Sequence, residues 1–130
     1  MTLFTADATP TFPSPGPGLT SWLVLLLAAP CLEEIVFRAG LQHGLHAWFG
    51  GHAAAGAGAI GISAVAFASL HAALNPSPWA WWTVLPALAL GALYQRTRRV
   101  GPCVALHAFF NLLWLAAPPL PGLAATGVAL

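Results

Sequence analysis

Residues 19 to 49 read LTSWLVLLLAAPCLEEIVFRAGLQHGLHAWF, and this stretch decides the fold. It is apolar with helical periodicity and long enough to cross a bilayer, which takes about 20 residues of helix. Pro30 is a candidate kink in that helix, and three charged side chains lie inside it: Glu33, Glu34 and Arg38. A charged side chain near the middle of a bilayer costs about 2.5 to 3.5 kcal/mol on insertion scales. The stretch therefore predicts a membrane helix whose charged residues have a functional or structural role.

The composition of the whole chain also indicates a bilayer as its solvent. Of 130 residues, 58% are hydrophobic and only 5% are charged, whereas a soluble domain has about 25% charged residues. The length allows one domain with about four spanning helices. The net charge of +1 provides no field for capturing nucleic acid. We therefore predict an all-α polytopic membrane helix bundle, with membrane lipid as a partner and nucleic acid excluded.

Three further apolar segments follow the first helix. Residues 59 to 75 are expected to form the second helix, after a flexible connection or loose helix start at 50 to 58. This helix must end before Pro76. A third helix is expected after the tryptophan-rich residues 79 to 82, because tryptophan favours membrane interfaces. Residues 103 to 117 complete the predicted bundle as a fourth helix.

The two ends of the chain differ from this core. Residues 1 to 18 are rich in Pro, Thr, Ser and Gly and are expected to be a disordered polar leader. Residues 119 to 130 are expected to be a C-terminal tail, which leaves 19 to 118 as the core domain. Three of the four Lys and Arg residues lie at 96 to 99. The positive-inside rule places that loop in the cytoplasm and the N-terminus outside.

The adjacent glutamates Glu33 and Glu34 are the strongest functional signal. Apart from Asp7 they are the only acidic residues in the chain. Residues four apart share a helix face, so Arg38 lies beside Glu34 and not beside Glu33. We expect Glu34 and Arg38 to form an ion pair that makes both charges tolerable in a low dielectric. Glu33 has no local partner, which suits a general base or acid.

Two other predicted helices carry polar residues at the same spacing, Phe67 with His71 and His107 with Asn111. A single histidine on an apolar face is more often a hydrogen-bonded core residue than a functional one. Glu33, two histidines and an asparagine on three helices instead predict a polar cluster inside the bundle. The cluster has a carboxylate and an imidazole to activate water, and donors for an oxyanion. These parts fit amide hydrolysis within the membrane.

Other reactive side chains carry weaker signals. No GxSxG motif marks Ser63 or Ser69 as a nucleophile, so both are expected to pack between helices. Cys31 and Cys103 lie in apolar surroundings without a CxxC pair, and we expect both to be small core residues. The histidines near the first connection are expected to be interfacial and structural: His43, His46 and His52.

Together, the three motifs resemble those of a known family. Glu33 to Arg38 match EExxxR, Phe67 to His71 match FxxxH, and His107 to Asn111 match HxxxN. This order is similar to that of the CAAX protease and bacteriocin-processing (CPBP, Abi) family, which includes the type II CAAX prenyl endopeptidases. Each motif alone is weak, but three in order on apolar helices are specific. The resemblance extends over about residues 20 to 117.

The resemblance implies an all-helical intramembrane protease of a bacterial inner membrane, with no cofactor favoured. Glu33 and His71 would activate a water, while His107 and Asn111 would hold the oxyanion. Three motif residues would support the site: Glu34, Arg38 and Phe67. The substrate would be a membrane-associated or C-terminally anchored protein or peptide, such as a prenylated protein or a bacteriocin leader. Relatives carry further helices before the first motif, so this chain resembles a bare catalytic core.

Three alternatives stay open at this point. Glu33, His71 and His107 with a water would supply the four ligands of a catalytic zinc site, although the chain has no HExxH motif. A non-catalytic immunity or scaffold protein would use the cluster for helix packing, at about 0.6 kcal/mol for each hydrogen bond. Packing does not require an unpartnered Glu33, however. A proton-coupled carrier would use these residues as a relay, which requires a homo-oligomer if there are only about four helices.

Overall fold

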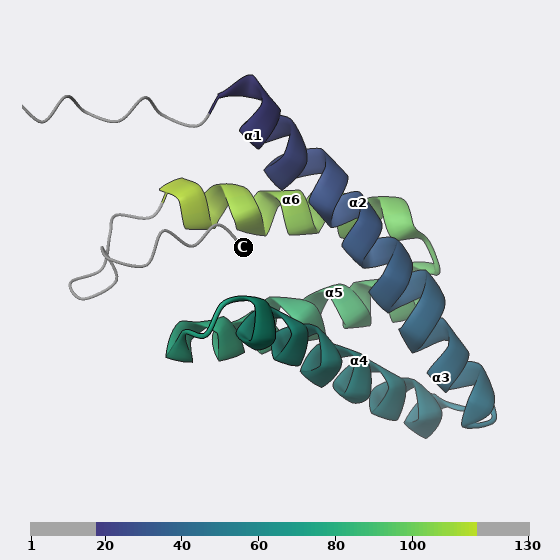
Figure 1. The fold of residues 1–130 in the computed structure, drawn as a ribbon. Helices are drawn as coiled ribbons and strands as arrows, with labels where there is room; N and C mark the ends of the chain where they lie inside the picture. Colours follow the sequence, from purple (N-terminus) through teal and green to yellow (C-terminus); the bar gives the residue numbers. More distant parts are fainter. Residues whose placement is uncertain (1–17, 117–130) are drawn as a thin grey trace, which may run out of the picture.

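The computed structural model describes residues 18 to 116, drawn in colour in Figure 1. Every element in this part of the chain is helical. The prediction of an all-α bundle is therefore confirmed. The expected C-terminal tail at 119 to 130, and the expected leader at 1 to 18 apart from Gly18, lie outside the described residues.

The first helical segment runs without a break from Leu19 to Trp48 and forms the long rod of Figure 1. Its consecutive parts are α1 (Leu19–Leu23), η1 (Val24–Ala28), α2 (Ala29–Glu34), η2 (Ile35–Gln42) and α3 (His43–Trp48). Both η parts are π-helical, with hydrogen bonds to the fifth residue back. The backbone stays helical through Pro30, and the hydrogen-bond register changes just before it.

Three more helical segments follow the rod. They are α4 (Ala53–Leu74), the 3-10 helix η3 (Pro78–Thr83) leading directly into α5 (Val84–Thr97), and α6 (Val100–Ala116). Helix α4 begins at Ala53, inside the segment expected to be a flexible connection or a loose helix start, where the His52 side chain accepts a hydrogen bond from the Ala55 N–H and caps the helix. Helix α5 ends at Thr97, and the next residue, Arg98, has a left-handed backbone with φ of 53°.

The outer faces of these helices are apolar. Leu19–Trp48 and Ala53–Leu74 are long and apolar enough to cross a membrane, and Val100–Ala116 is a shorter apolar helix. Large apolar side chains remain exposed along all three, among them Leu32, Val65 and Phe109. Contiguous exposed apolar surface on this scale is typical of contact with lipid. Tryptophans 79, 81 and 82 are also exposed, as expected of an interfacial belt.

Helix α4 is the central packing element. It lies beside α5 and also contacts η2 and α3 of the rod. Alanines 59, 64 and 68 of α4 have no exposed surface, and such small side chains let membrane helices approach closely. Helix α6 crosses the rod at η1 and α2 and packs on α5. This crossing brings the third motif, on α6, against the first motif, on the rod.

Candidate active site

An ion pair lies at the centre of the polar cluster. Glu34 Oε2 is 2.9 Å from Arg38 Nε, and neither side chain has any exposed surface. This is the pairing that the spacing of four residues predicted. Removing one partner of a fully buried pair leaves an uncompensated charge and costs about 3 to 5 kcal/mol. The two residues therefore depend on each other.

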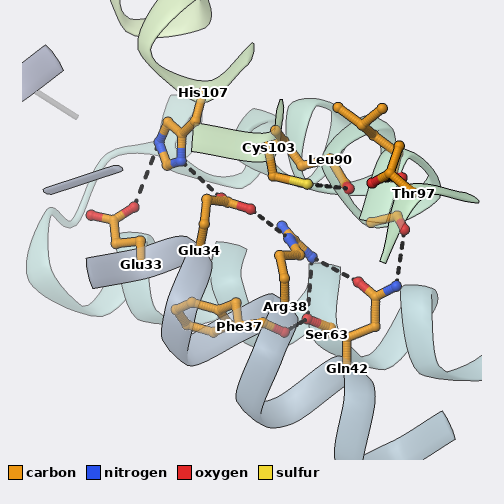
Figure 2. A network of polar contacts seen from close by, with 12 residues as sticks. Glu33, Glu34, Phe37, Arg38, Gln42, Ser63, Leu90, Thr97, Cys103 and His107 are labelled. Atoms are coloured by element: carbon orange, nitrogen blue, oxygen red, sulfur yellow. Dashed lines mark hydrogen bonds and ion pairs between the residues drawn. The ribbon is translucent and has the colours of Figure 1, made fainter. Parts of the chain in front are cut away.

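His107 connects α6 to both glutamates of the rod, as Figure 2 shows. Its Nδ1 is 2.9 Å from Glu34 Oε1, and its Nε2 is 3.6 Å from Glu33 Oε2. An ionised carboxylate can only accept hydrogen bonds, so Nδ1 carries the hydrogen and donates it to Glu34. This bond fixes the ring with Nε2 facing Glu33.

The charges of this cluster balance. Glu34 and Arg38 cancel each other, so Glu33 and His107 form a neutral pair when they hold one mobile proton between them. Unbalanced charge is expensive in a low dielectric, which favours this one-proton state. The proton can reside on His107, beside an ionised Glu33, or on Glu33. A pair that shares one proton is suited to acid–base chemistry.

Glu33 differs from Glu34 in its surroundings. The Glu33 side chain is 27% exposed, whereas Glu34 is fully buried. Within residues 18 to 116, Glu33 Oε2 has no hydrogen-bond partner, because 3.6 Å to His107 is too long for one. Glu33 is therefore the carboxylate with a free acceptor for a water or a substrate, as the spacing argument expected.

The second motif orients His71 by stacking. The rings of Phe67 and His71 are 4.2 Å apart and inclined by 28°, and His71 Nδ1 is 3.0 Å from the Phe67 carbonyl oxygen. A carbonyl only accepts, so Nδ1 carries a hydrogen, and in the neutral ring Nε2 keeps its lone pair. Phe67 also meets His107 edge-on at 5.8 Å. Phe67 therefore lies between the imidazoles of the second and third motifs.

Asn111 contacts a backbone group that Pro30 leaves without its helical partner. The Ala29 N–H bonds to the Val24 carbonyl in the π register of η1. The next bond in that register would join Pro30 to the Leu25 carbonyl, but proline has no N–H. Asn111 Nδ2 donates to that carbonyl instead, at 2.8 Å. One of the two amide hydrogens of Asn111 therefore stabilises the rod, and the second is available for another hydrogen bond.

Two residues that sequence reasoning missed also contact Arg38. Its Nη1 is 3.2 Å from Ser63 Oγ and 3.4 Å from Gln42 Oε1, and all three side chains are fully buried. From sequence, Ser63 is expected only to pack between helices. The available signal was spacing, because Gln42 follows Arg38 by four residues and therefore lies on the same helix face.

The remaining candidates among the described residues make no hydrogen bond or ion pair with the side chains of this cluster. Cys103 is buried and donates to the Leu90 carbonyl, while Cys31 is partly buried, and both are free thiols. His43 and Ser69 are exposed. His46 is buried at the far end of the rod, in α3.

The residues considered for zinc do not form a ligand set. In the part of the chain that the structure describes, no group of three or more His, Cys, Asp or Glu side chains could hold a metal ion. Glu33, His71 and His107 are therefore not assigned as metal ligands.

Comparison with known families determines the class of the protein. Residues 15 to 113 match the profile of the family described as type II CAAX prenyl endopeptidase Rce1-like. This chain belongs to that family. Comparison with curated proteins and with solved structures found no match.

Membership of the Rce1-like family makes the chain a membrane protein and a protease of the CAAX intramembrane class. The exposed apolar helices agree with that assignment. All motif residues from Glu33 to Asn111 lie inside the matched range. The polar cluster is therefore the candidate active site of this Rce1-like protein.

Proposed function

We propose that this Rce1-like protein hydrolyses a peptide bond of a C-terminally anchored or otherwise membrane-associated protein, using a water activated by Glu33 and His71. The observation that carries the proposal is the buried Oε2 of Glu33, which has no hydrogen-bond partner among the described residues and faces His107 at 3.6 Å. A free carboxylate oxygen next to an imidazole is what a glutamate-dependent peptidase needs.

In the proposed reaction, a water attacks the substrate carbonyl carbon while its proton passes to Glu33. His71 accepts a hydrogen bond from the same water through Nε2, which orients the attack. The carbonyl becomes an oxyanion as the new C–O bond forms. Protonated His107 donates its Nε2–H to that oxyanion. The C–N bond then breaks, and Glu33 returns the proton to the leaving nitrogen.

Other motif residues would act on these groups. Glu34, held by Arg38, keeps the His107 ring turned toward the reacting carbonyl. The second amide hydrogen of Asn111 is available as a further oxyanion donor. Removing one such donor typically lowers the rate about 100- to 1,000-fold.

The substrate is proposed from the family description and from the membrane setting. The family description names CAAX prenyl endopeptidases, and a CAAX sequence is a C-terminal motif whose cysteine carries a prenyl group and is followed by three residues. The apolar outer faces of α4 and α6 would keep such an anchor in the bilayer. We further propose a bacterial inner membrane, with the arginines at 96 to 99 in the cytoplasm, because positive loops stay inside.

The test measures the cleavage of two peptides in liposomes. Both have a cysteine as the fourth residue from the C-terminus, and they differ only in whether that cysteine carries a prenyl group. We expect the native protein to release the C-terminal tripeptide. Glu33→Gln should lower the rate about 100- to 10,000-fold, because it removes the general base. Asp7→Asn, which removes the one acidic residue outside the motif, is the matched control and should cleave normally. Equal rates for the two peptides would remove the prenyl group from the proposal.

A zinc chelator separates the mechanisms. We expect unchanged cleavage, whereas inhibition that zinc reverses would replace the glutamate mechanism with a zinc peptidase. If the folded native protein cuts neither peptide, bacteriocin leaders and C-terminal anchors are assayed in the same liposomes. Failure with all of them would support a non-catalytic scaffold or immunity role.

A further inference from the structure

Four buried polar residues follow one face of the rod at intervals of four, and we call them the polar ladder: Glu34, Arg38, Gln42 and His46. Residues at this spacing lie one above the other on a helix. The first two belong to the EExxxR motif. Gln42 belongs to no motif, although it is fully buried in an apolar helix. Burying an amide is costly unless it is hydrogen-bonded, so its partners indicate its role.

Gln42 joins Arg38 to the backbone of α5. Its Oε1 accepts from Arg38 Nη1 at 3.4 Å, and its Nε2 donates to the Gly91 carbonyl at 2.9 Å. The approach to α5 is close, because a Cβ on Gly91 would lie 3.1 Å from Gln42 Oε1 and 3.5 Å from Arg38 Nη1. The amide is therefore held at a fixed place between the two helices.

Ser63 joins Arg38 to α4 in the same way. Its Oγ accepts from Arg38 Nη1 at 3.2 Å and donates to the Phe37 carbonyl at 3.0 Å. Both hydrogen-bonding directions of the hydroxyl are therefore defined. Arg38 Nη1 thus donates to two side chains, Gln42 and Ser63 (Figure 2). Each of these side chains is in turn hydrogen-bonded to a different backbone carbonyl.

The Nε edge of the Arg38 guanidinium is connected to His107 and Glu33 through Glu34. Arg38 Nε donates to Glu34 Oε2 at 2.9 Å, and Glu34 Oε1 accepts from His107 Nδ1 at 2.9 Å. The far nitrogen of His107 then faces Glu33. Arg38, Glu34 and His107 have little or no exposed surface, so a shift of Arg38 would be passed on to the His107 ring and not absorbed by water.

We infer that Gln42 and Ser63 are positioning residues, which hold Arg38 so that Glu34 keeps His107 turned toward Glu33. The inference rests on the proposed function, since it assigns the two residues to the same site. Partners that position a reacting group through another residue typically change activity about 10- to 100-fold when they are removed. A purely structural role would instead change stability and leave the His107 ring in place.

The test uses Gln42→Leu and Ser63→Ala in the full chain. Gln42→Leu keeps much of the volume and removes both hydrogen bonds, while Ser63→Ala removes one acceptor of Nη1 and leaves the other. The matched controls are Gln95→Leu, a partly buried glutamine on α5, and Ser69→Ala, an exposed serine on α4. Because Ser63→Ala is the smaller change, it keeps the test open if Gln42→Leu does not fold.

The first readout does not depend on activity. The ring nitrogens of His107 are observed by NMR in protein with 15N-labelled histidine, and His107→Gln assigns them. We expect both ring resonances to move in Gln42→Leu and Ser63→Ala and to stay in place in the two controls. Unmoved His107 resonances in folded variants would overturn the inference.

The second readout is the cleavage of the peptides named above. We expect kcat to fall about 10- to 100-fold in both variants, with KM unchanged, because the reacting groups are displaced and substrate binding is not. Unchanged kcat in variants whose His107 resonances move would also overturn the inference. If the native protein cleaves nothing, the proposed function fails, while the His107 resonances still decide whether these residues position the ring.

Discussion

The Nδ1 atom of His107 lies 2.9 Å from the Oε1 atom of Glu34, although 73 residues separate the two in sequence. This bond joins the third motif to the first. It also gives the two adjacent glutamates different roles. Glu34 accepts hydrogen bonds from Arg38 and His107, whereas Oε2 of Glu33 has no hydrogen-bond partner among the described residues.

Removing one member of the Glu34–Arg38 pair should cost more stability than removing both. Glu34→Gln leaves the buried Arg38 without its counter-charge and should lower the free energy of unfolding by about 3 to 5 kcal/mol. The double variant Glu34→Leu with Arg38→Met removes both charges and should recover most of that loss. Thermal unfolding in detergent, followed by circular dichroism, measures both. Peptide cleavage should stay low in the double variant, because His107 has lost its carboxylate. A double variant no more stable than Glu34→Gln would contradict this account.

Asn111 and Pro30 should be coupled energetically. Asn111→Ala leaves the Leu25 carbonyl without its donor and should cost about 1 to 3 kcal/mol of stability. In a Pro30→Ala background the backbone N–H is restored, so the same substitution should cost less. A double-mutant cycle on unfolding free energies measures the coupling, which should be about 0.5 to 3 kcal/mol. Additive costs would mean that the proline does not create the need for Asn111.

Gly91 should tolerate no side chain. A Cβ there would lie 3.0 Å from Ile60 Cγ2 and 3.1 Å from Gln42 Oε1. Gly91→Ala should therefore destabilise the protein by about 1 to 3 kcal/mol through overpacking. Gly61→Ala is the control, because a Cβ at Gly61 meets nothing within 4 Å. There the better helix propensity of alanine should add about 0.5 to 1 kcal/mol of stability. Equal unfolding temperatures for the two variants would contradict the close approach at Gly91.

Phe67 should matter more for activity than for stability. Its ring stacks on His71 and meets His107 edge-on. Phe67→Leu keeps an apolar side chain and should cost about 0.5 to 1.5 kcal/mol, the typical energy of an aromatic pair. Peptide cleavage should fall about 100-fold if the imidazoles shift by about 1 Å. Phe109→Leu, at an exposed position on α6, should change neither quantity. Normal cleavage in Phe67→Leu would show that the stacking does not orient the imidazoles.

Much of the fold could be predicted from hydrophobicity alone. Apolar segments with helical periodicity, separated by Pro, Gly and Arg, indicate the helices of a membrane bundle. The sequence left residues 50 to 58 open between a flexible connection and a loose helix start, because a segment of alanines and glycines is compatible with both. The capping bond from Ala55 to His52 begins the helix at Ala53. Such a bond depends on the local geometry of the chain and not on residue type alone.

The candidate site was predictable where it follows helix spacing. The Glu34–Arg38 pair lies within one helix, so its spacing of four residues is enough to predict the contact. The role of Ser63 was not predictable, because its partner Arg38 lies on another helix. Asn111 shows the same limit, since its partner is the carbonyl of Leu25, 86 residues away.

The sequence by itself determined that this chain is a helical membrane protein, that Glu34 pairs with Arg38, and that Glu33 has no partner on its own helix. These properties depend on hydrophobicity and on the helix repeat, which act over a few residues. Only the tertiary structure decided which groups meet across helices: His107 with Glu34, Asn111 with Leu25, and Ser63 with Arg38. Contacts of this kind depend on how helices cross and rotate against one another, because packing sets those angles and no local pattern does.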